Sequence, residues 1–436
     1  MARPKIIAGI DIGTEKICTL IASLSAEDQK ISVLGVASQS SLGLRKSQIV
    51  DIEEAINSIT ESVEAAERMA GYSINDAFIS ISGTHIQSQN SKGVVAVSEP
   101  DGEINPDDVE RVIEAARAIS LSSDREILHV IPRDFIVDSQ EGIKDPVGMS
   151  GVRLEAEAHI ITGSSTAMRN MAKCVGELGI NVSGLVFSGL ASSYTTLSDT
   201  EKELGVVLID IGGGTTSLTV IIEGTLAYST VLPVGARNIT NDLAIGMRVS
   251  LESAEKIKLA LSQSSPKPQL PKDASDKDIK KEKKKADEVN LTNLGLKEDI
   301  KTASRKTLVE GIIRPRLNEI FTMIGKELKK KNFVGLTPAG VVLTGGGAET
   351  VGIVDSCKRI LTVPTRIGTP TGLSGLVEEI QTSAYAASTG LIIYGAHNQV
   401  AESGGFSFKG VSRLVNKLPG KGVVPKVIDF FRSFLP

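Results

Sequence analysis

Two parts of the chain share one order of apolar and polar positions. Ile6–Ala22 reads as an apolar strand, Asp-Ile-Gly, a short Gly/Thr turn and a second strand, and Gly205–Ile222 has the same plan. In each copy a third strand-like run follows (Lys30–Ser38 and Thr225–Val234), and then a helical pattern. The tripeptide alone could recur by chance, but the shared strand–turn–strand–strand–helix order favours duplication. The pattern therefore predicts an α/β fold with two related lobes.

A small α/β subdomain is predicted inside the first lobe, over residues 83–163. Its sequence reads as a strand, a helix capped near Asn105 and Pro106, and another strand. The other parts are the first lobe (1–82 and 164–199, with a helix over 382–398 packing back on it), the second-lobe core (200–235 and 308–381), a second-lobe small subdomain (236–307), a linker (399–422) and a terminal amphipathic helix (423–436).

Residues 262–290 differ in kind from the rest of the chain. They combine prolines and many charges with few large apolar residues. Such a segment cannot bury enough surface to order itself, so we expect a flexible loop in the small subdomain. Its lysine cluster at 280–285 could bind an acidic partner, although a solvated tract is the ordinary interpretation of a charge run.

The segment 423–436 is amphipathic when it is drawn on a helical wheel, with Lys426, Asp429 and Arg432 on its polar side. Two interpretations stay open from the pattern alone. The helix could dock on the body of the protein, or it could lie in the interface of an anionic bilayer. In the second interpretation the membrane-binding residues are Val424, Val427, Ile428, Phe430, Phe431, Phe434 and Leu435.

Composition narrows the class of protein. With 436 residues the chain is expected to form several domains, because single cores split beyond about 250–300 residues. A net charge of −4 gives no general attraction to nucleic acid, and we expect no nucleic-acid partner. The three cysteines lie far apart, which argues against a disulfide framework and fits a reducing cytoplasm. No apolar run reaches the roughly 18 residues of a membrane-spanning helix.

Three glycine-rich turns follow predicted buried strands and carry the candidate chemistry. Backbone N–H groups in such turns form concavities that suit phosphate oxygens. Asp11 and Asp210 end two of these strands, where their carboxylates could hold a hydrated Mg²⁺ or orient a water. Ordinary hairpins with structural glycines are the alternative for each turn taken alone. A third turn at Gly345–Gly347, and the absence of P-loop, dinucleotide-binding and G-x-S-x-G motifs, favour a nucleotide cleft of another kind.

The two Asp-x-Gly turns and the late Thr-Gly-Gly-Gly-Ala turn resemble the ATPase fold shared by actin, Hsp70 chaperones and sugar kinases. This resemblance implies ATP and Mg²⁺ as cofactors, with Asp11 and Asp210 positioning Mg²⁺ and water. It also implies that a helix at 253–261 contacts the nucleoside. The implied nucleotide-binding residues are Gly13, Thr14, Lys16, Gly212, Gly213, Gly214, Thr215, Glu255, Lys258, Gly345, Gly346 and Gly347.

The inserted subdomain at 83–163, the stretch Pro315–Ile324 and the tail resemble the bacterial cell-division family FtsA over nearly the whole chain. That family implies an actin-like protein that binds ATP, polymerises and tethers the FtsZ ring to the cytoplasmic face of the inner membrane. The implied partners are the FtsZ C-terminal tail, further copies of the chain, anionic lipid and other division proteins. Arg305 and Arg316 are candidates for the FtsZ-binding face, with solvated helix charges as the alternative.

Two alternatives within the same ATPase fold stay open at this point. A pilus-assembly relative could share the whole nucleotide site, and a sugar kinase would need a substrate pocket between the lobes. Whether ATP is hydrolysed slowly or only regulates assembly also stays open.

Overall fold

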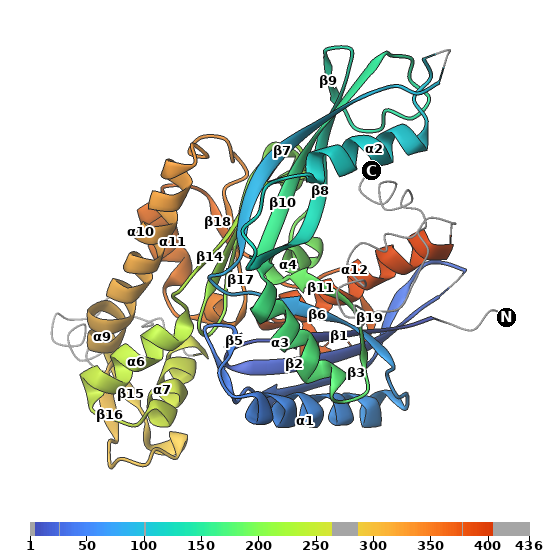
Figure 1. The fold of residues 1–436 in the computed structure, drawn as a ribbon. Helices are drawn as coiled ribbons and strands as arrows, with labels where there is room; N and C mark the ends of the chain where they lie inside the picture. Colours follow the sequence, from blue (N-terminus) through green and yellow to red (C-terminus); the bar gives the residue numbers. More distant parts are fainter. Residues whose placement is uncertain (1–4, 26, 100–101, 264–286, 377, 404–436) are drawn as a thin grey trace.

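A computed structural model of the chain describes residues 5–25, 27–99, 102–263, 287–376 and 378–403 (Figure 1). The predicted terminal helix over 423–436, with its candidate membrane-binding residues, lies outside these residues. So do most of the lysine-rich segment and most of the predicted linker.

The first lobe is built on a six-stranded sheet with the order β11-β6-β1-β2-β3-β19. Strand β1 pairs antiparallel with β2 and parallel with β6, so the chain leaves the meander through a crossover before it returns beside β1. The strands are β1 (Lys5–Ile12), β2 (Lys16–Leu24), β3 (Ile31–Ser40), β6 (Asp76–Ile81), β11 (Asn181–Phe187) and β19 (Ser374–Gly375).

The second lobe repeats this arrangement in a five-stranded sheet with the order β14-β13-β12-β17-β18. Again the first strand of the meander pairs antiparallel with the second and parallel with a strand that comes later in the chain. The predicted duplication is therefore confirmed by strand order. The strands are β12 (Val206–Ile211), β13 (Thr216–Ile222), β14 (Thr225–Leu232), β17 (Val341–Thr344) and β18 (Thr365–Ile367).

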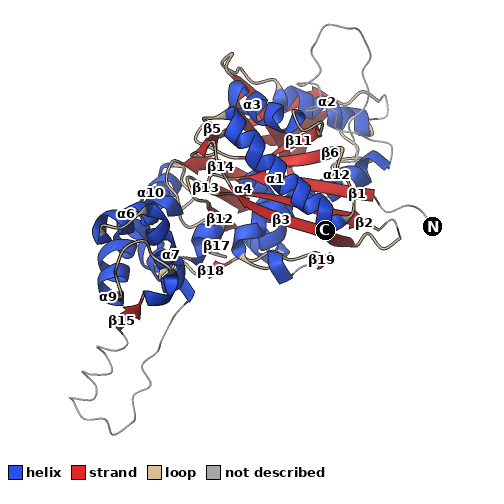
Figure 2. Cartoon of the chain, turned by 90° about the horizontal axis from the view of Figure 1, so that it is seen from below, coloured by secondary structure: helices blue, strands red, loops and turns tan. Residues whose placement is uncertain are grey.

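Helix α1 (Ile52–Ala70) crosses one face of the first-lobe sheet, as Figure 2 shows. Asp51 caps its beginning, because its side chain accepts a hydrogen bond from the Glu54 N–H, and Gly71 ends it in the left-handed conformation. Its buried residues recur on one face with helical spacing, which is why this helix was predictable from the sequence.

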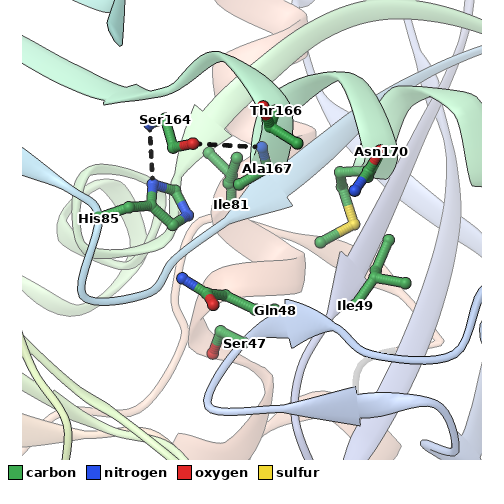
Figure 3. Close-up of a pocket in the computed structure, with 10 residues that line it drawn as sticks. Ser47, Gln48, Ile49, Ile81, His85, Ser164, Thr166, Ala167 and Asn170 are labelled. Atoms are coloured by element: carbon green, nitrogen blue, oxygen red, sulfur yellow. Dashed lines mark hydrogen bonds between the residues drawn. The ribbon is translucent and has the colours of Figure 1, made fainter. Parts of the chain in front are cut away.

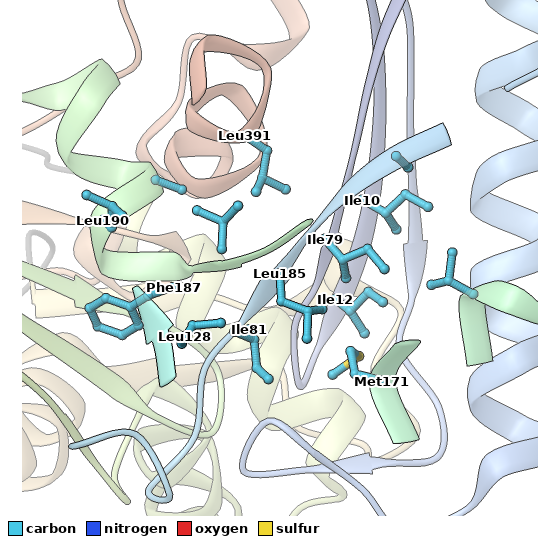
Figure 4. Packing of buried hydrophobic residues seen from close by; sticks show 14 of the residues in the cluster. Ile10, Ile12, Ile79, Ile81, Leu128, Met171, Leu185, Phe187, Leu190 and Leu391 are labelled. Carbon is cyan, nitrogen blue, oxygen red and sulfur yellow. The ribbon is translucent and has the colours of Figure 1, made fainter. Parts of the chain in front are cut away.

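Two helices, α4 (Ser188–Thr196) and α12 (Ala386–Ser403), cross between the lobes and are called the hinge helices below. They approach so closely that a Cβ built on Gly390 would lie 1.9 Å from the Ala191 carbonyl oxygen. Leu190 and Leu391, one from each helix, join the core cluster that includes Ile10, Ile79 and Phe187 (Figure 4). The crossing thus shares one apolar core with the first-lobe sheet and α3 (Ser165–Gly176).

The inserted subdomain forms its own sheet with the order β7-β10-β8-β9, and α2 packs against it. Its elements are β7 (Gln87–Ala96), α2 (Pro106–Arg117), β8 (Arg125–Val137), β9 (Gln140–Ile143) and β10 (Arg153–Ser164). Asn105 caps α2 in a full capping box with Asp108, as the sequence indicated. The subdomain also contacts the edge of the second-lobe sheet, where Ser88 Oγ donates to the Ser229 carbonyl at 2.7 Å.

The second-lobe small subdomain shares one apolar core with the second-lobe sheet. Its main helices and short strands lie between β14 and β17 in the chain. Helix α5, which precedes β12, and helix α11, which follows β17, also belong to the second lobe. These elements are α5 (Asp199–Leu204), α6 (Ala236–Met247), α7 (Leu251–Gln263), β15 (Glu288–Asn290), η1 (Thr292–Leu294), β16 (Thr302–Ser304), α9 (Arg305–Leu308), the π-helical η2 (Val309–Ile313), α10 (Arg314–Lys330) and α11 (Ile353–Leu361).

Two predicted segments have the wrong bounds at both ends. The flexible loop expected over 262–290 is shorter, because α7 continues to Gln263 and β15 begins at Glu288. Val289 packs against the second-lobe core and pairs with Ala303, which orders that end of the segment. The helix expected over 382–398 begins at Ala386 and runs to Ser403, so it extends into the predicted linker.

Candidate functional site

The three glycine-rich turns meet at one cavity of about 220 Å³ between the lobes. One turn joins β1 to β2, the second joins β12 to β13, and the third follows β17. Each turn lies at the end of a strand that contacts one of the hinge helices. Strands that are far apart in the sequence therefore end at the same place. The lining residues are Asp11, Ile12, Gly13, Thr14, Glu15, Lys16, Ser47, Ser80, Ser82, Ser188, Asp210, Gly212, Gly213, Thr215, Ser217, Gly345, Gly346, Ala384 and Ala387.

Asp11 is held by a serine of the neighbouring strand. Ser80 Oγ on β6 donates to Asp11 Oδ1 at 2.6 Å and accepts from the Ile12 N–H at 3.0 Å. Burial raises the pKa of Asp11, while the Ser80 hydrogen bond and the charge of Lys16 oppose that rise. One carboxylate oxygen is therefore anchored in the protein.

Asp210 has the same kind of partner, but from another element. Ser192 Oγ on the hinge helix α4 donates to Asp210 Oδ2 at 2.7 Å. The pKa of Asp210 is raised to about 6, mainly by burial and also by the nearby Asp11 charge, while the Ser192 hydrogen bond and the charge of Lys16 oppose the rise. Two partly buried carboxylates that repel one another form a local negative field, which favours a divalent cation.

Gly345 is required where the third turn passes Asp210. Its φ is +81°, and a Cβ at this position would lie 2.3 Å from Asp210 Oδ1. A side chain would therefore collide with the carboxylate and would also strain the backbone. Gly345 thus allows the third turn to close over the second carboxylate.

Lys16 bridges the first turn and the beginning of α12. Its Nζ donates to the Ala384 carbonyl at 2.8 Å and lies 3.6 Å from the centre of the Tyr385 ring. An anion in the cavity would compete with these two contacts for the ammonium group. Lys16 therefore links the cavity to the segment that leads into α12.

The two Asp-bearing turns contact one another across the lobes. A Cβ on Gly213 would lie 2.2 Å from Glu15 Cγ, and Arg237 pairs with Glu15 at 3.0 Å. Serines link the deeper part of the cavity, where Ser217 Oγ lies 3.2 Å from Ser82 Oγ and 3.1 Å from Ser188 Oγ. A nucleotide bound here would have to break some of these contacts between the turns and between the serines.

Some predicted site residues lie outside the cavity lining. Gly214 packs against Thr14, and Gly347 packs against Ile211, so both support the turns from behind. Lys258 is buried on α7, where its Nζ lies 2.8 Å from Glu255 Oε2 and donates to Thr240 Oγ1 at 3.0 Å. These contacts arise because α7 packs on α6.

The two arginines predicted for a partner face lie on the small subdomain. Arg316 on α10 makes two hydrogen bonds to Asp242, at 2.6 and 2.9 Å, and also pairs with Glu319. Arg305 on α9 donates to the Leu261 carbonyl at 3.0 Å. Both side chains therefore have partners within the small subdomain.

The carboxylates fit Mg²⁺ only together with a phosphate ligand. Within the described residues, no group of three or more His, Cys, Asp or Glu side chains is placed to hold a metal ion. Mg²⁺ usually takes one or two carboxylates and completes its shell with waters and phosphate oxygens. Asp11 and Asp210, each anchored through one oxygen, match that donor set.

Sequence reasoning missed the serines that organise this site. In the sequence each of them is only a small polar residue within a strand, helix or turn, and no motif marks it. These serines are Ser80, Ser82, Ser192 and Ser217. One signal could have indicated Ser80. It is a polar residue in an otherwise largely apolar strand, and that strand is expected to pair with the strand that ends in Asp11.

This duplicated, two-lobed α/β architecture with an Asp-bearing turn in each lobe is the actin-like ATPase fold. The structure of the PilM–PilN type IV pilus biogenesis complex has the same fold, with a TM-score of 0.61, 16% identity, and coverage of 89% of this chain and 98% of that chain. The protein-family model described as "SHS2 domain inserted in FTSA" matches residues 83–162, and the one described as "Cell division protein FtsA" matches residues 207–390.

Full-length relatives lead to the same family. The chain is 41% identical to cell division protein FtsA of Borreliella burgdorferi, over 89% of this chain and 90% of the relative. It is 37% identical to FtsA of Pseudomonas aeruginosa (91% and 90%) and 33% identical to FtsA of Escherichia coli K12 (91% and 91%). The chain belongs to the FtsA family of cell-division proteins. Among its described residues, no helix combines the length and apolarity needed to cross a membrane.

Proposed function

We propose that this cell-division protein binds Mg·ATP between its lobes, polymerises, and tethers the FtsZ ring to the cytoplasmic face of the inner membrane. The observation that carries the nucleotide part is the convergence of three glycine turns and two anchored carboxylates on one cavity. Family membership supports the division role, and the sequence of the tail supports the membrane part.

In this proposal the glycine turns and the hydroxyls of Thr14 and Thr215 hold phosphate oxygens, and Lys16 adds a positive charge. Mg²⁺, when bound, neutralises phosphate charge and completes its shell with the nucleotide. Asp11 and Asp210 orient the ion and its waters, because Ser80 and Ser192 fix one oxygen of each carboxylate. Glu255, Lys258 and the turn Gly345–Gly347 are proposed for the nucleoside.

Nucleotide is proposed to regulate assembly rather than to serve metabolism. The turns that line the cavity contact one another across the lobes, where Arg237 pairs with Glu15. We expect a nucleotide held by both turns to change these contacts, which would link nucleotide binding to the relative position of the two lobes.

The tail is proposed to bind anionic lipid reversibly. Each buried large apolar side chain contributes about 1.5–3 kcal/mol, less the cost of ordering the helix. Several tails on one polymer would bind much more strongly than one, because linked weak sites gain avidity. Polymerisation is thus physically useful to a membrane tether.

Arg305 and Arg316 remain proposals for the FtsZ-binding face. Because Arg316 already pairs with Asp242 and Glu319, an acidic peptide would have to compete with these carboxylates. Other division proteins are proposed as further partners in general terms.

Co-sedimentation with anionic liposomes tests the proposal. Full-length protein is compared with a chain that ends at Leu418, with and without Mg·ATP. We expect the full chain to pellet with lipid, more so with Mg·ATP, and the shortened chain to stay in the supernatant. If neither chain pellets under any condition, the tethering role is wrong, and kinase assays with sugars become the next test.

A further inference from the structure

A short hairpin that no motif indicated contacts both Asp-bearing turns. It consists of β4 (Leu44–Arg45) and β5 (Gln48–Ile49), joined by the two-residue turn Lys46–Ser47. Ser47 is buried and lines the cavity that also contains Asp11 and Asp210.

Ser47 contacts the hydroxyl of each turn. Its N–H donates to Thr14 Oγ1 at 2.9 Å, and its Oγ lies 3.0 Å from Thr215 Oγ1. Thr14 belongs to the first lobe and Thr215 to the second. Ser47 is therefore placed where a phosphate oxygen held by both threonines would also meet a third hydroxyl.

The backbone of this turn is strained. Lys46 and Ser47 have φ values of +50° and +58°, which correspond to the left-handed conformation at both central positions of a hairpin. Asn and Gly are the residues that favour such a turn, and this chain has neither there. Strained residues that persist are concentrated at ligand clamps, where the surrounding structure holds them in place.

A second cavity of about 170 Å³ lies on the other side of the turn (Figure 3). Ser47, Gln48 and Ile49 line one side of it, and His85 and the beginning of α3 line another. Because Ser47 lines both cavities, the turn lies between them and forms part of the wall of each.

We propose that Ser47 donates a hydrogen bond to the terminal phosphate of a bound nucleoside triphosphate, and so distinguishes it from a diphosphate. This inference rests on the proposed nucleotide function. The third turn, Gly345–Gly347, is proposed for the nucleoside, whereas Ser47 contacts the tips of the other two turns. The phosphate farthest from the nucleoside is then the one that reaches Ser47.

The test is a calorimetric titration of the full chain with Mg·ADP and with the Mg²⁺ complex of an ATP analogue that has a non-hydrolysable β,γ-imido bridge. Ser47→Ala and Ser47→Gly both remove the hydroxyl, but only glycine also relieves the left-handed strain. We expect both variants to lose about tenfold in affinity for the triphosphate, since a hydrogen bond to a charged group is lost. Their affinity for Mg·ADP should change less than about twofold.

Gln48→Ala is the matched control, because Gln48 is exposed on the same hairpin and lines the second cavity but not the phosphate cavity. It should leave both affinities unchanged. Equal losses for both nucleotides in the Ser47 variants, or no loss, would overturn the inference. A loss confined to Ser47→Gly would assign the effect to the backbone and also overturn it. If the unmodified chain binds neither nucleotide, the proposed function itself fails.

Discussion

The two halves of the site have one topology and two different ways of holding a carboxylate. Ile10 pairs with Ile79, and Ile209 pairs with Leu343, so Ser80 and Thr344 occupy equivalent positions one residue later. In the first lobe that residue, Ser80, binds Asp11 directly. In the second lobe Thr344 instead donates to the carbonyls of Gly368 and Ser383.

Asp210 takes its partner from Ser192 on the hinge helix, outside its own sheet. The first carboxylate is thus fixed by its own lobe, whereas the second is fixed by an element between the lobes. A change in the angle between the lobes should therefore disturb Asp210 more than Asp11. The two lobes have equivalent backbones, but the side chains that hold the two carboxylates differ.

The largest effect on stability is expected at Gly345, because the second lobe requires a glycine there and the first lobe has Ile81 at the equivalent position. Gly345→Ala places a Cβ 2.3 Å from Asp210 Oδ1 at a φ of +81°, and should reduce the free energy of unfolding by about 2–4 kcal/mol. Thermal or urea unfolding measures this. Gly346→Ala is the control, because its Cβ would lie 3.7 Å from Ala384 Cβ, an ordinary contact. Equal destabilisation by both variants would contradict the role given to Gly345.

The raised pKa of Asp210 predicts that its charge destabilises the folded protein at neutral pH. Because the folded pKa of about 6 exceeds the ordinary value, folding favours the protonated carboxyl group. The stabilisation that this proton provides is full at low pH, is lost as pH rises through about 6, and is absent once Asp210 is charged. Asp210→Asn should therefore raise the free energy of unfolding at pH 7.5, on the order of 2 kcal/mol, and have little effect near pH 4. Urea unfolding at both pH values measures the difference.

The control for this prediction is Asp199→Asn, since the Asp199 side chain is 97% exposed on the second lobe. It should change stability little at either pH. An Asp210→Asn variant that is less stable than the parent at pH 7.5 would show that the charged form is stabilised rather than strained.

Removing the two serines compares the halves directly. Ser192→Ala should weaken Mg·ATP binding about three- to tenfold at pH 7, because the pKa of Asp210 then rises further and less carboxylate is charged. Binding should recover as pH is raised to 8.5. Ser80→Ala is the matched variant in the first lobe. Titration calorimetry across this pH range provides the measurement, and an Ser192→Ala deficit that does not depend on pH would refute the explanation.

The smallest effect is expected for the ion pair between the lobes. Arg237 and Glu15 are each about half exposed, and solvent-exposed pairs contribute about 0.2–1 kcal/mol. Glu15→Gln should therefore change the unfolding free energy by less than about 1 kcal/mol, with less effect at high salt. A loss above 2 kcal/mol in chemical denaturation would mean that this contact, rather than the buried serines, holds the lobes together.

Much of the fold could be predicted from the chain, because periodicity and turn residues report local structure. The two meanders, α1 and the capped helix α2 are confirmed, since each depends on residues within a few positions of one another. The ends of 262–290 were not predictable, because Val289 is ordered by a distant core.

The site divides in the same way. The turns that contain Asp11 and Asp210 are visible in the sequence, because glycine and aspartate at the end of a strand are local signals. Ser192 and Ser47 are not, because their importance arises only from partners that lie far away in the chain. The burial of Lys258 against Thr240 was not predictable either, because it follows from the packing of α6 on α7, which no local pattern specifies.

The most direct test of the account is a count of nucleotide sites. Mg·ATP is titrated into the full chain, Asp11→Asn and Asp210→Asn, and the stoichiometry is measured by calorimetry. If both lobes build one site, the full chain binds one nucleotide, and either substitution weakens that binding by about a hundredfold or more. Two sites per chain, with one surviving in each variant, would contradict this account, as would unchanged binding in both variants.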